Sequence, residues 1–395
     1  MTRFQSRVLA ALIGVALLPP PAVRGQALLC PADTAIGSDL DDRTRLATLL
    51  GRAPGDAQLL RSLSSRLAPF DTTRGSLSWC ALRPDVTLVS STGMPFSLND
   101  GPLWAGVGWS EDVRVGLRMR RGRFWLVLAP QFLATENLPY PMPYPDVELP
   151  RPAGRSPFSS PWHVGAYSID LPLRFGDRGF WKVDPGQSTL GADLGPVVAG
   201  LSTENEWWGP GIENAIVMSN NAAGIPRAFV RTARPVRTRV GTFAVRWFLG
   251  GLFKSQYFDN NPASDRRSIT ALAATWTPVG VPRLTLGFTR AVFAPLSGWQ
   301  DVFGHAFDVL RDRGVHGTGD STTVSRDQIF SLFGRWVFPA DGFAVHAEWA
   351  RTVPPHSVRD FLTSPNHTQG YTLGLEWARP LHAERDALRV QAEIT

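Results

Sequence analysis

Long apolar runs, cysteine and lysine are all scarce in this chain of 395 residues. After residues 8–18, no stretch is long and apolar enough to cross a membrane as a helix. The two cysteines, Cys30 and Cys80, are too few to support a disulfide-rich scaffold. Lys182 and Lys254 are the only lysines, and codon usage in a GC-rich genome explains most of the excess of arginine. The scarcities exclude a helical membrane anchor and a disulfide scaffold.

Motifs for catalysis and metal binding are also missing. The chain has no HExxH, CxxC, GxSxG or P-loop sequence, and its seven histidines lack metal-ligand spacing. It has no basic helix, zinc-type spacing or RNP-like motif that would favour nucleic acid as a partner. We therefore predict a protein that is not an enzyme, with no catalytic residues, no metal, no other cofactor and no nucleic-acid partner.

The first residues have the pattern of a secretory signal peptide. Arg3 and Arg7 precede the apolar residues 8–18, and "PPPAVRGQA" then supplies small residues suited to cleavage. We predict that residues 1–25 are a signal peptide and that the protein is exported. An exported compartment permits a disulfide between Cys30 and Cys80.

A helical pattern follows the predicted signal peptide. Leucines recur at helical spacing after "SDLDD" and again after Asp56, while Gly51, Pro54 and Gly55 separate the two stretches. We predict a helical hairpin at roughly residues 38–68, within a periplasmic helical segment of residues 26–75.

From about residue 76 the apolar residues recur with a period of two. In "VRVGLRMR", residues 113–120, apolar side chains alternate with a face that is nearly all arginine, and residues 121–128 follow as a return strand. "TFAVRWFL" at 242–249 and "RLTLGFTR" at 283–290 repeat the alternation. We predict antiparallel strands throughout residues 76–395.

A soluble sandwich and an outer-membrane barrel both show such alternation. Export, tryptophans near strand ends and the lengths of the connections favour the barrel. Short turns such as "RRGR", "GVPR" and "PADG" contrast with long segments such as 134–162 and 292–327. We therefore predict an all-β fold, a transmembrane antiparallel β-barrel preceded by the helical hairpin.

The segment "STENEWWGPGIENAIVMSNNAAGIPRAF", residues 202–229, carries the most specific pattern in the chain. An acidic residue precedes Trp-Trp-Gly-Pro-Gly, and Ser-Asn-Asn and a proline follow. This pattern resembles the central signature of the Wzi family of capsule assembly proteins. The resemblance implies a barrel of about eighteen strands, helices on the periplasmic side, and a surface lectin that holds polysaccharide at the cell envelope.

The C-terminal sequence departs from that pattern. "LRVQAEIT" lacks the aromatic terminal residue that is common in the last strand of a barrel, and members of the family are longer. We therefore expect a truncated chain or one that lacks the final strands of the barrel.

The role of the Trp-Trp motif has two interpretations. Tryptophan rings stack on sugar rings, and carboxylates, amides and arginines bond to hydroxyl groups. Alternatively, the turn 209–211 folds inward and plugs the lumen, with the tryptophans as packing wedges. Packing is the favoured interpretation for the tryptophan pair, and arginines would then make a basic lumen. The candidate polysaccharide-binding residues are Glu206, Trp207, Trp208, Asn220, Asn221, Arg227, Arg114, Arg118 and Arg246.

These patterns predict a monomeric protein of the cell outer membrane, in contact with outer-membrane lipid. It would bind capsular polysaccharide or exopolysaccharide and attach it at the cell surface. A porin-like channel for small anionic solutes is the alternative. A carbohydrate-active outer-membrane enzyme using Glu204 and Glu206 is a weaker one.

Overall fold

The computed structural model describes residues 29–30, 36–53, 59–66, 77–93, 95, 97–140, 175–254, 266–281, 283–296, 298–311, 326–352, 369–381 and 386–395. The predicted signal peptide lies outside these residues and stays a prediction. Among the described residues, no helix has the length and hydrophobicity needed to cross a membrane.

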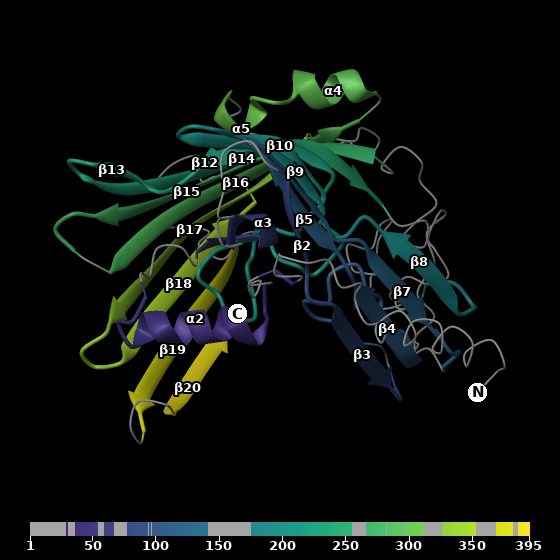
Figure 1. Cartoon of the computed structure of the whole chain (residues 1–395), viewed down its shortest axis with the longest axis horizontal. Helices are drawn as coiled ribbons and strands as arrows, with labels where there is room; N and C mark the ends of the chain where they lie inside the picture. Colours follow the sequence, from purple (N-terminus) through teal and green to yellow (C-terminus); the bar gives the residue numbers. More distant parts are fainter. Residues whose placement is uncertain are drawn as a thin grey trace.

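The largest part of the fold is a curved antiparallel sheet of 14 strands (Figure 1). Its order is β2-β5-β6-β9-β10-β12-β14-β15-β16-β17-β18-β19-β20, with β13 beside β14. The strands are β2 (Leu77–Ala81), β5 (Leu117–Arg121), β6 (Phe124–Leu128), β9 (Thr189–Leu194), β10 (Val197–Ser202), β12 (Arg227–Thr232), β13 (Val236–Thr238), β14 (Gly241–Phe253), β15 (Arg266–Pro278), β16 (Leu284–Pro295), β17 (Asp327–Phe338), β18 (Phe343–Arg351), β19 (Gln369–Pro380) and β20 (Ala387–Ile394). The predicted antiparallel all-β class is confirmed. Within the described residues the sheet is open, with β2 and β20 as its end strands.

A second sheet continues four of these strands past a sharp bend. It contains β3 (Asp85–Ser91), β4 (Gly108–Arg114), β7 (Gln131–Thr135) and β8 (Phe180–Asp184) in the order β3-β4-β7-β8. This order matches β2-β5-β6-β9, because each strand of one sheet adjoins a strand of the other along the chain.

The bend overturns one detail of the predicted strands. Residues 113–120 are not a single strand, since β4 ends at Arg114 and β5 begins at Leu117 in the other sheet. Gly116 lies where the backbones crowd: a Cβ there would be 2.4 Å from the carbonyl oxygen of Leu128. The alternation continues across the bend, so the sequence pattern does not reveal it.

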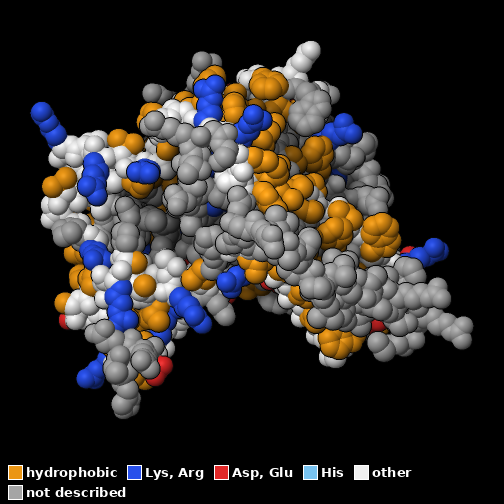
Figure 2. All heavy atoms as spheres, viewed as in Figure 1, with side chains coloured by type: hydrophobic (Ala, Val, Ile, Leu, Met, Phe, Trp, Pro, Cys, Tyr) orange, Lys and Arg blue, Asp and Glu red, His pale blue; other side chains and the backbone are white. Residues whose placement is uncertain are grey.

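Strand β19 of the main sheet has polar side chains on its inner face and apolar side chains on its outer face. Along β19, Leu373 and Leu375 are more than half exposed, whereas Thr372 and Glu376 are fully buried. Leu388 and Val390 on β20 are likewise half exposed, and Figure 2 shows a broad hydrophobic patch over β9 and β5. A soluble domain buries its apolar side chains, so this distribution is the inverse of a soluble sandwich.

Helix α2 (Asp39–Leu49) lies across one end of the sheet, beside β17 and β19 (Figure 1). Its N-cap is Ser38, whose hydroxyl accepts a hydrogen bond from the Asp41 amide at 3.3 Å. Leu49 is fully buried against Val337 and Ala344. Val337 and Ala344 flank the short turn between β17 and β18, so α2 lies at the short-turn end.

Within the described residues, the second predicted helix is in part a strand. Helix α3 covers Leu63–Arg66, and the leucine before it, Leu60, lies in the two-residue strand β1 (Leu60–Arg61). β1 pairs with β11 (Trp207–Trp208), and this long-range pairing overrides the helical spacing of the leucines. Conversely, the long connection predicted at 292–327 contains two short helices, α4 (Trp299–Gly304) and α5 (Asp308–Arg311).

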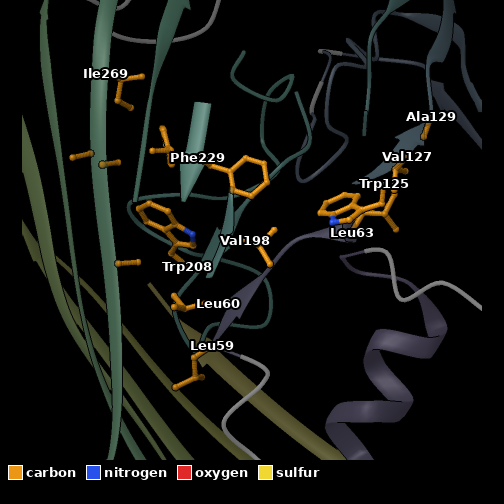
Figure 3. Packing of buried hydrophobic residues seen from close by; sticks show 14 of the residues in the cluster. Leu59, Leu60, Leu63, Trp125, Val127, Ala129, Val198, Trp208, Phe229 and Ile269 are labelled. Carbon is orange, nitrogen blue, oxygen red and sulfur yellow. The ribbon is translucent and has the colours of Figure 1, made fainter. Parts of the chain in front are cut away.

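A buried apolar cluster joins these N-terminal segments to the inner face of the sheet. Trp208 and Leu60 pack with side chains such as Phe229 and Ile269 from the strands (Figure 3). Cys30 and Cys80 belong to the same cluster and form the disulfide that the exported compartment permits. The N-terminal segment is thereby fixed to β2 at one edge of the sheet.

Candidate functional site

The Trp-Trp motif lies in a segment that fills the space inside the sheet. Residues 203–226 connect β10 to β12, and we call them the plug. β11, inside the plug, pairs with β1 in the register Leu60↔Trp208 and Arg61↔Trp207. The amide of Gly209 donates to the carbonyl of Leu59 at 2.9 Å. The plug and the N-terminal segment therefore form one unit inside the sheet.

Glu206 anchors the plug to the strands. Its carboxylate is 3.1 Å from Arg227 on β12 and 2.5 Å from Arg246 on β14. It also accepts a hydrogen bond from the indole of Trp208 at 3.0 Å. Burial favours a raised pKa, but the two guanidinium groups and the Trp208 bond outweigh it and hold the pKa of Glu206 below its usual value.

The Trp pair and its partners are enclosed. Trp207 is 1% exposed and Trp208 is 0% exposed. The guanidinium of Arg61 lies 4.9 Å from the centre of the Trp207 ring. Glu206 and Arg227 are buried as well, so these residues contact protein and present no surface to a sugar.

Glu206, Trp207, Trp208, Arg227 and Arg246 thus all contact protein in this structure, and their predicted role in polysaccharide binding stays a prediction. Each side chain contacts protein through the group that was expected to contact the sugar. Arg246, for example, donates to the Leu60 carbonyl at 2.7 Å as well as to Glu206. The structure agrees with the packing interpretation of the motif.

Glu204, the other carboxylate of the predicted pair, has a separate structural contact. Its two oxygens accept bonds from the amide and hydroxyl of Ser64, at 2.8 and 2.7 Å, at the start of α3. Both oxygens of Glu206 likewise bind arginine or tryptophan, so all four oxygens of the pair have protein partners.

A second ionic cluster fixes helix α2 at the short-turn end. Arg45 on α2 makes a bidentate contact with Glu376 on β19, at 2.8 and 2.7 Å. Arg335 and Arg389 also contact Glu376, at 3.1 and 3.2 Å. Glu376 and Arg335 are almost fully buried, so this end of the interior is filled by paired charges.

A polar cavity of about 140 Å³ lies on the other side of the plug, at the bend between the two sheets. It differs from the ionic clusters in that most of its polar side chains are amides and carboxylates. The residues that line it are Ile36, Leu63, Asp85, Thr87, Asn99, Asp100, Gly101, Asp112, Arg114, Gln131, Gln187, Asn205 and Asn220.

One wall of the cavity comes from the bent strands. Asp112 and Arg114 share a face of β4, since side chains two residues apart on a strand point the same way. Arg114 is 2.9 Å from Asp85 on β3, and Gln131 on β7 donates to Asp112 Oδ2 at 2.5 Å. Neighbouring strands thus bring these side chains together.

The opposite wall comes from the plug and from the turn at residues 97–103. Asn220 donates to the carbonyl of Asn99 at 2.9 Å, and the Asn99 amide donates to Asn221 Oδ1 at 2.7 Å. Asn205 accepts from Gln187 at 2.6 Å. The Ser-Asn-Asn stretch therefore shapes the cavity wall.

Several oxygens of the lining residues have no hydrogen-bond partner. They are Asp112 Oδ1, Asn99 Oδ1 and Asn220 Oδ1, and all three are buried acceptors. Buried polar atoms without partners are uncommon in folded proteins, because each costs free energy. Asp112 as a whole is 9% exposed. All three oxygens belong to residues that line the cavity, so its chemistry suits a ligand that presents hydrogen-bond donors.

The predicted site residues divide between these regions. Of the residues predicted to bind polysaccharide, Asn220 and Arg114 line the cavity, while Asn221 fixes its wall from an exposed position. Arg118 lies on β5, buried outside the lining. Sequence reasoning missed Asp112 and Gln131, although the spacing of "EDVR" placed Asp112 on the same face as Arg114.

Within the described residues, no group of histidine, cysteine, aspartate and glutamate side chains could hold a metal ion.

Comparison with known proteins gives little further information. No family model matches the chain, and no curated protein matches it. One similar solved structure is Wzi from Escherichia coli, described as an outer-membrane protein involved in group 1 capsule assembly and a carbohydrate-binding β-barrel. It has 11% sequence identity and a TM-score of 0.46, over 81% of this chain and 56% of that one. The chain thus spans 56% of that structure's length, and a likeness of this degree carries no argument about function.

Proposed function

We propose that this protein is an outer-membrane β-barrel protein that binds surface polysaccharide and does not catalyse a reaction. The observation that carries the proposal is the polar cavity with unpaired acceptors inside a sheet whose outer face is apolar. The apolar face suits lipid, and the cavity suits a hydroxyl-rich ligand.

The outer face supports contact with lipid. Trp336 and Trp377 are 40% and 36% exposed, and Leu373 and Ile394 are 55% and 70% exposed. In water such a surface would drive aggregation, whereas the hydrocarbon of a bilayer accommodates it. Localisation in the outer membrane follows from this reasoning together with the predicted signal peptide.

The filled interior supports binding over conduction. The plug and α2 occupy the space inside the sheet, and buried ion pairs such as Glu206–Arg227 and Arg45–Glu376 hold them there. A porin needs a continuous water-filled lumen. An interior that several buried contacts hold in place favours ligand binding over the conduction of solutes.

The orientation of the barrel in the membrane supports binding at the outer surface of the cell. In outer-membrane barrels the short turns face the periplasm and the long connections face outward. Helix α2 lies at the short-turn end, and the cavity lies beyond the bend, away from those turns. On this orientation α2 is periplasmic and the cavity is on the extracellular side of the plug.

The proposal is tested with the full chain folded in detergent and in liposomes. Saturable binding to the cell's own surface polysaccharide, with little release of salt from the liposomes, is the expected result. Ion conductance without polysaccharide binding would instead establish the channel. Size-exclusion chromatography with light scattering tests the proposed monomer in the same sample.

A further inference from the structure

We infer that the polar cavity binds one sugar unit that carries no negative charge, through Asp112, Asn99 and Asn220. The inference rests on the proposed function and specifies the class of sugar that the site takes. It replaces the predicted basic lumen, which would have favoured acidic sugars.

The charges that line the cavity favour this class. Asp85, Asp100 and Asp112 are carboxylates, and Arg114 is the one guanidinium in the lining. Arg114 is already 2.9 Å from Asp85. A uronic acid would therefore bring its carboxylate toward uncompensated negative charge, which costs free energy at short range. Neutral sugars and amino sugars avoid this repulsion.

The hydrogen-bonding groups favour a ligand rich in donors. Asp112 Oδ1 lacks a partner although Asp112 Oδ2 accepts from Gln131. The free side-chain atoms of Asn99 and Asn220 are likewise oxygens, while their amide nitrogens donate to protein carbonyls. Sugar hydroxyl groups and a protonated amine supply donors to such oxygens.

The size of the cavity limits the ligand to one unit. Its volume of about 140 Å³ is well below the roughly 300–1,000 Å³ of pockets for drug-sized molecules. A single unit gives weak affinity, and a repeating polymer raises the overall affinity by presenting many copies near one site.

The first arm of the test measures binding of three oligosaccharides of equal length to the folded full chain by calorimetry at fixed salt. The probes are a neutral glucose oligomer, a glucosamine oligomer and a galacturonic acid oligomer. The expected result is that one of the first two binds at least about tenfold more tightly than the galacturonic acid oligomer. Tightest binding of the galacturonic acid oligomer would overturn the inference.

The second arm compares two variants of one residue. Asp112→Leu removes the acceptor and should weaken binding of the preferred probe about tenfold or more. Asp112→Asn keeps an acceptor and removes the charge, so it should retain that probe within about threefold and narrow the discrimination against galacturonate. Asp341→Leu and Asp341→Asn, at an exposed turn on the opposite end, are the matched controls.

Failure of this inference is distinguishable from failure of the proposed function. The cell's own polysaccharide is titrated against the same variants, after circular dichroism has confirmed that each is folded. Wild-type binding that Asp112→Leu leaves unchanged would overturn the cavity as the site and retain the proposed function. Loss of binding only in Asp112→Leu supports both. Binding of an oligosaccharide probe without binding of the polysaccharide would retain the cavity and overturn the proposed function.

Discussion

The plug contacts and the polar cavity differ in how completely their buried carboxylates are paired. Around Glu206, each carboxylate oxygen has a charged or indole partner, and a similar arrangement surrounds Glu376. Around Asp112, one oxygen has a partner and the other has none. Buried ionic groups that satisfy one another hold a structure in place, whereas unsatisfied groups are available to a ligand.

This difference separates residues that resemble one another in sequence. Glu206 directly precedes β11 and Asp112 lies within β4, and both are carboxylates near arginines. Partners from β12 and β14 surround Glu206, while the partners of Asp112 come from the bent sheet alone. The same residue type therefore stabilises the fold at one position and recognises ligand, on our inference, at the other.

The largest effect on stability is expected for Glu206→Ala. The change leaves the buried Arg227 and Arg246 without their carboxylate, at a cost of about 3–5 kcal/mol in the free energy of unfolding. Urea unfolding in detergent, followed by tryptophan fluorescence, measures it. Glu213→Ala is the control in the same plug, since that side chain is exposed, and it should cost less than about 0.5 kcal/mol. Equal costs would show that the ion pairs do not hold the plug.

Loss of the disulfide should have the next largest effect. Replacing both Cys30 and Cys80 with serine frees the N-terminal segment from β2 and should cost about 2–4 kcal/mol. Reductant should lower the unfolding midpoint of the wild type and leave that of the double variant unchanged. An insensitive wild type would mean that noncovalent contacts suffice to hold the segment.

Gly209→Ala should be moderately destabilising. The residue has φ of +136°, and a Cβ there would lie 2.9 Å from the carboxylate of Glu348. Strain of this kind costs about 1–3 kcal/mol. Gly280→Ala, in a turn with open space around the added carbon, should change the free energy of unfolding by only a few tenths of a kcal/mol. Thermal unfolding of both variants measures the difference.

The pH dependence of stability should also report on the plug. Because the folded state lowers the pKa of Glu206 below 4.5, the unfolded state binds a proton first as the pH falls. The stabilisation is therefore complete above the unfolded pKa and is lost as the pH falls toward the lower folded pKa. This stabilisation amounts to about 1.4 kcal/mol for each unit by which the folded state lowers the pKa of Glu206. The difference in unfolding free energy between the wild type and Glu206→Gln should shrink below pH 4.5; a constant difference would contradict the assignment.

The smallest effect on stability is expected for Asp112→Asn. The replacement keeps an oxygen that can accept from Gln131 and removes a buried charge. The free energy of unfolding should change by less than about 1 kcal/mol, measured in the same urea titration. A loss comparable to that of Glu206→Ala would show that Asp112 is a structural residue and would remove the contrast between the two regions.

Much of the fold is predictable because strand alternation is a local signal. The return strand after residues 113–120 and the strands of "TFAVRWFL" and "RLTLGFTR" all lie in the main sheet. The cavity is a different case. Its walls come from β3, β4, β7, the turn at 97–103 and the plug, and the bend that brings them together leaves no mark on the alternation.

The sequence by itself determined that the chain forms antiparallel strands with one polar and one apolar face, and that a helix begins near Ser38. Only the tertiary structure decided which polar groups are paired. Arg45 and Glu376 are 331 residues apart, yet they form a bidentate contact in the interior. Strand periodicity depends on neighbours along the chain, whereas ion pairing and cavities depend on neighbours in space. For that reason the sequence pattern identified the Trp-Trp motif of the plug, whereas the unpaired acceptors at the bend are recognisable only in the folded structure.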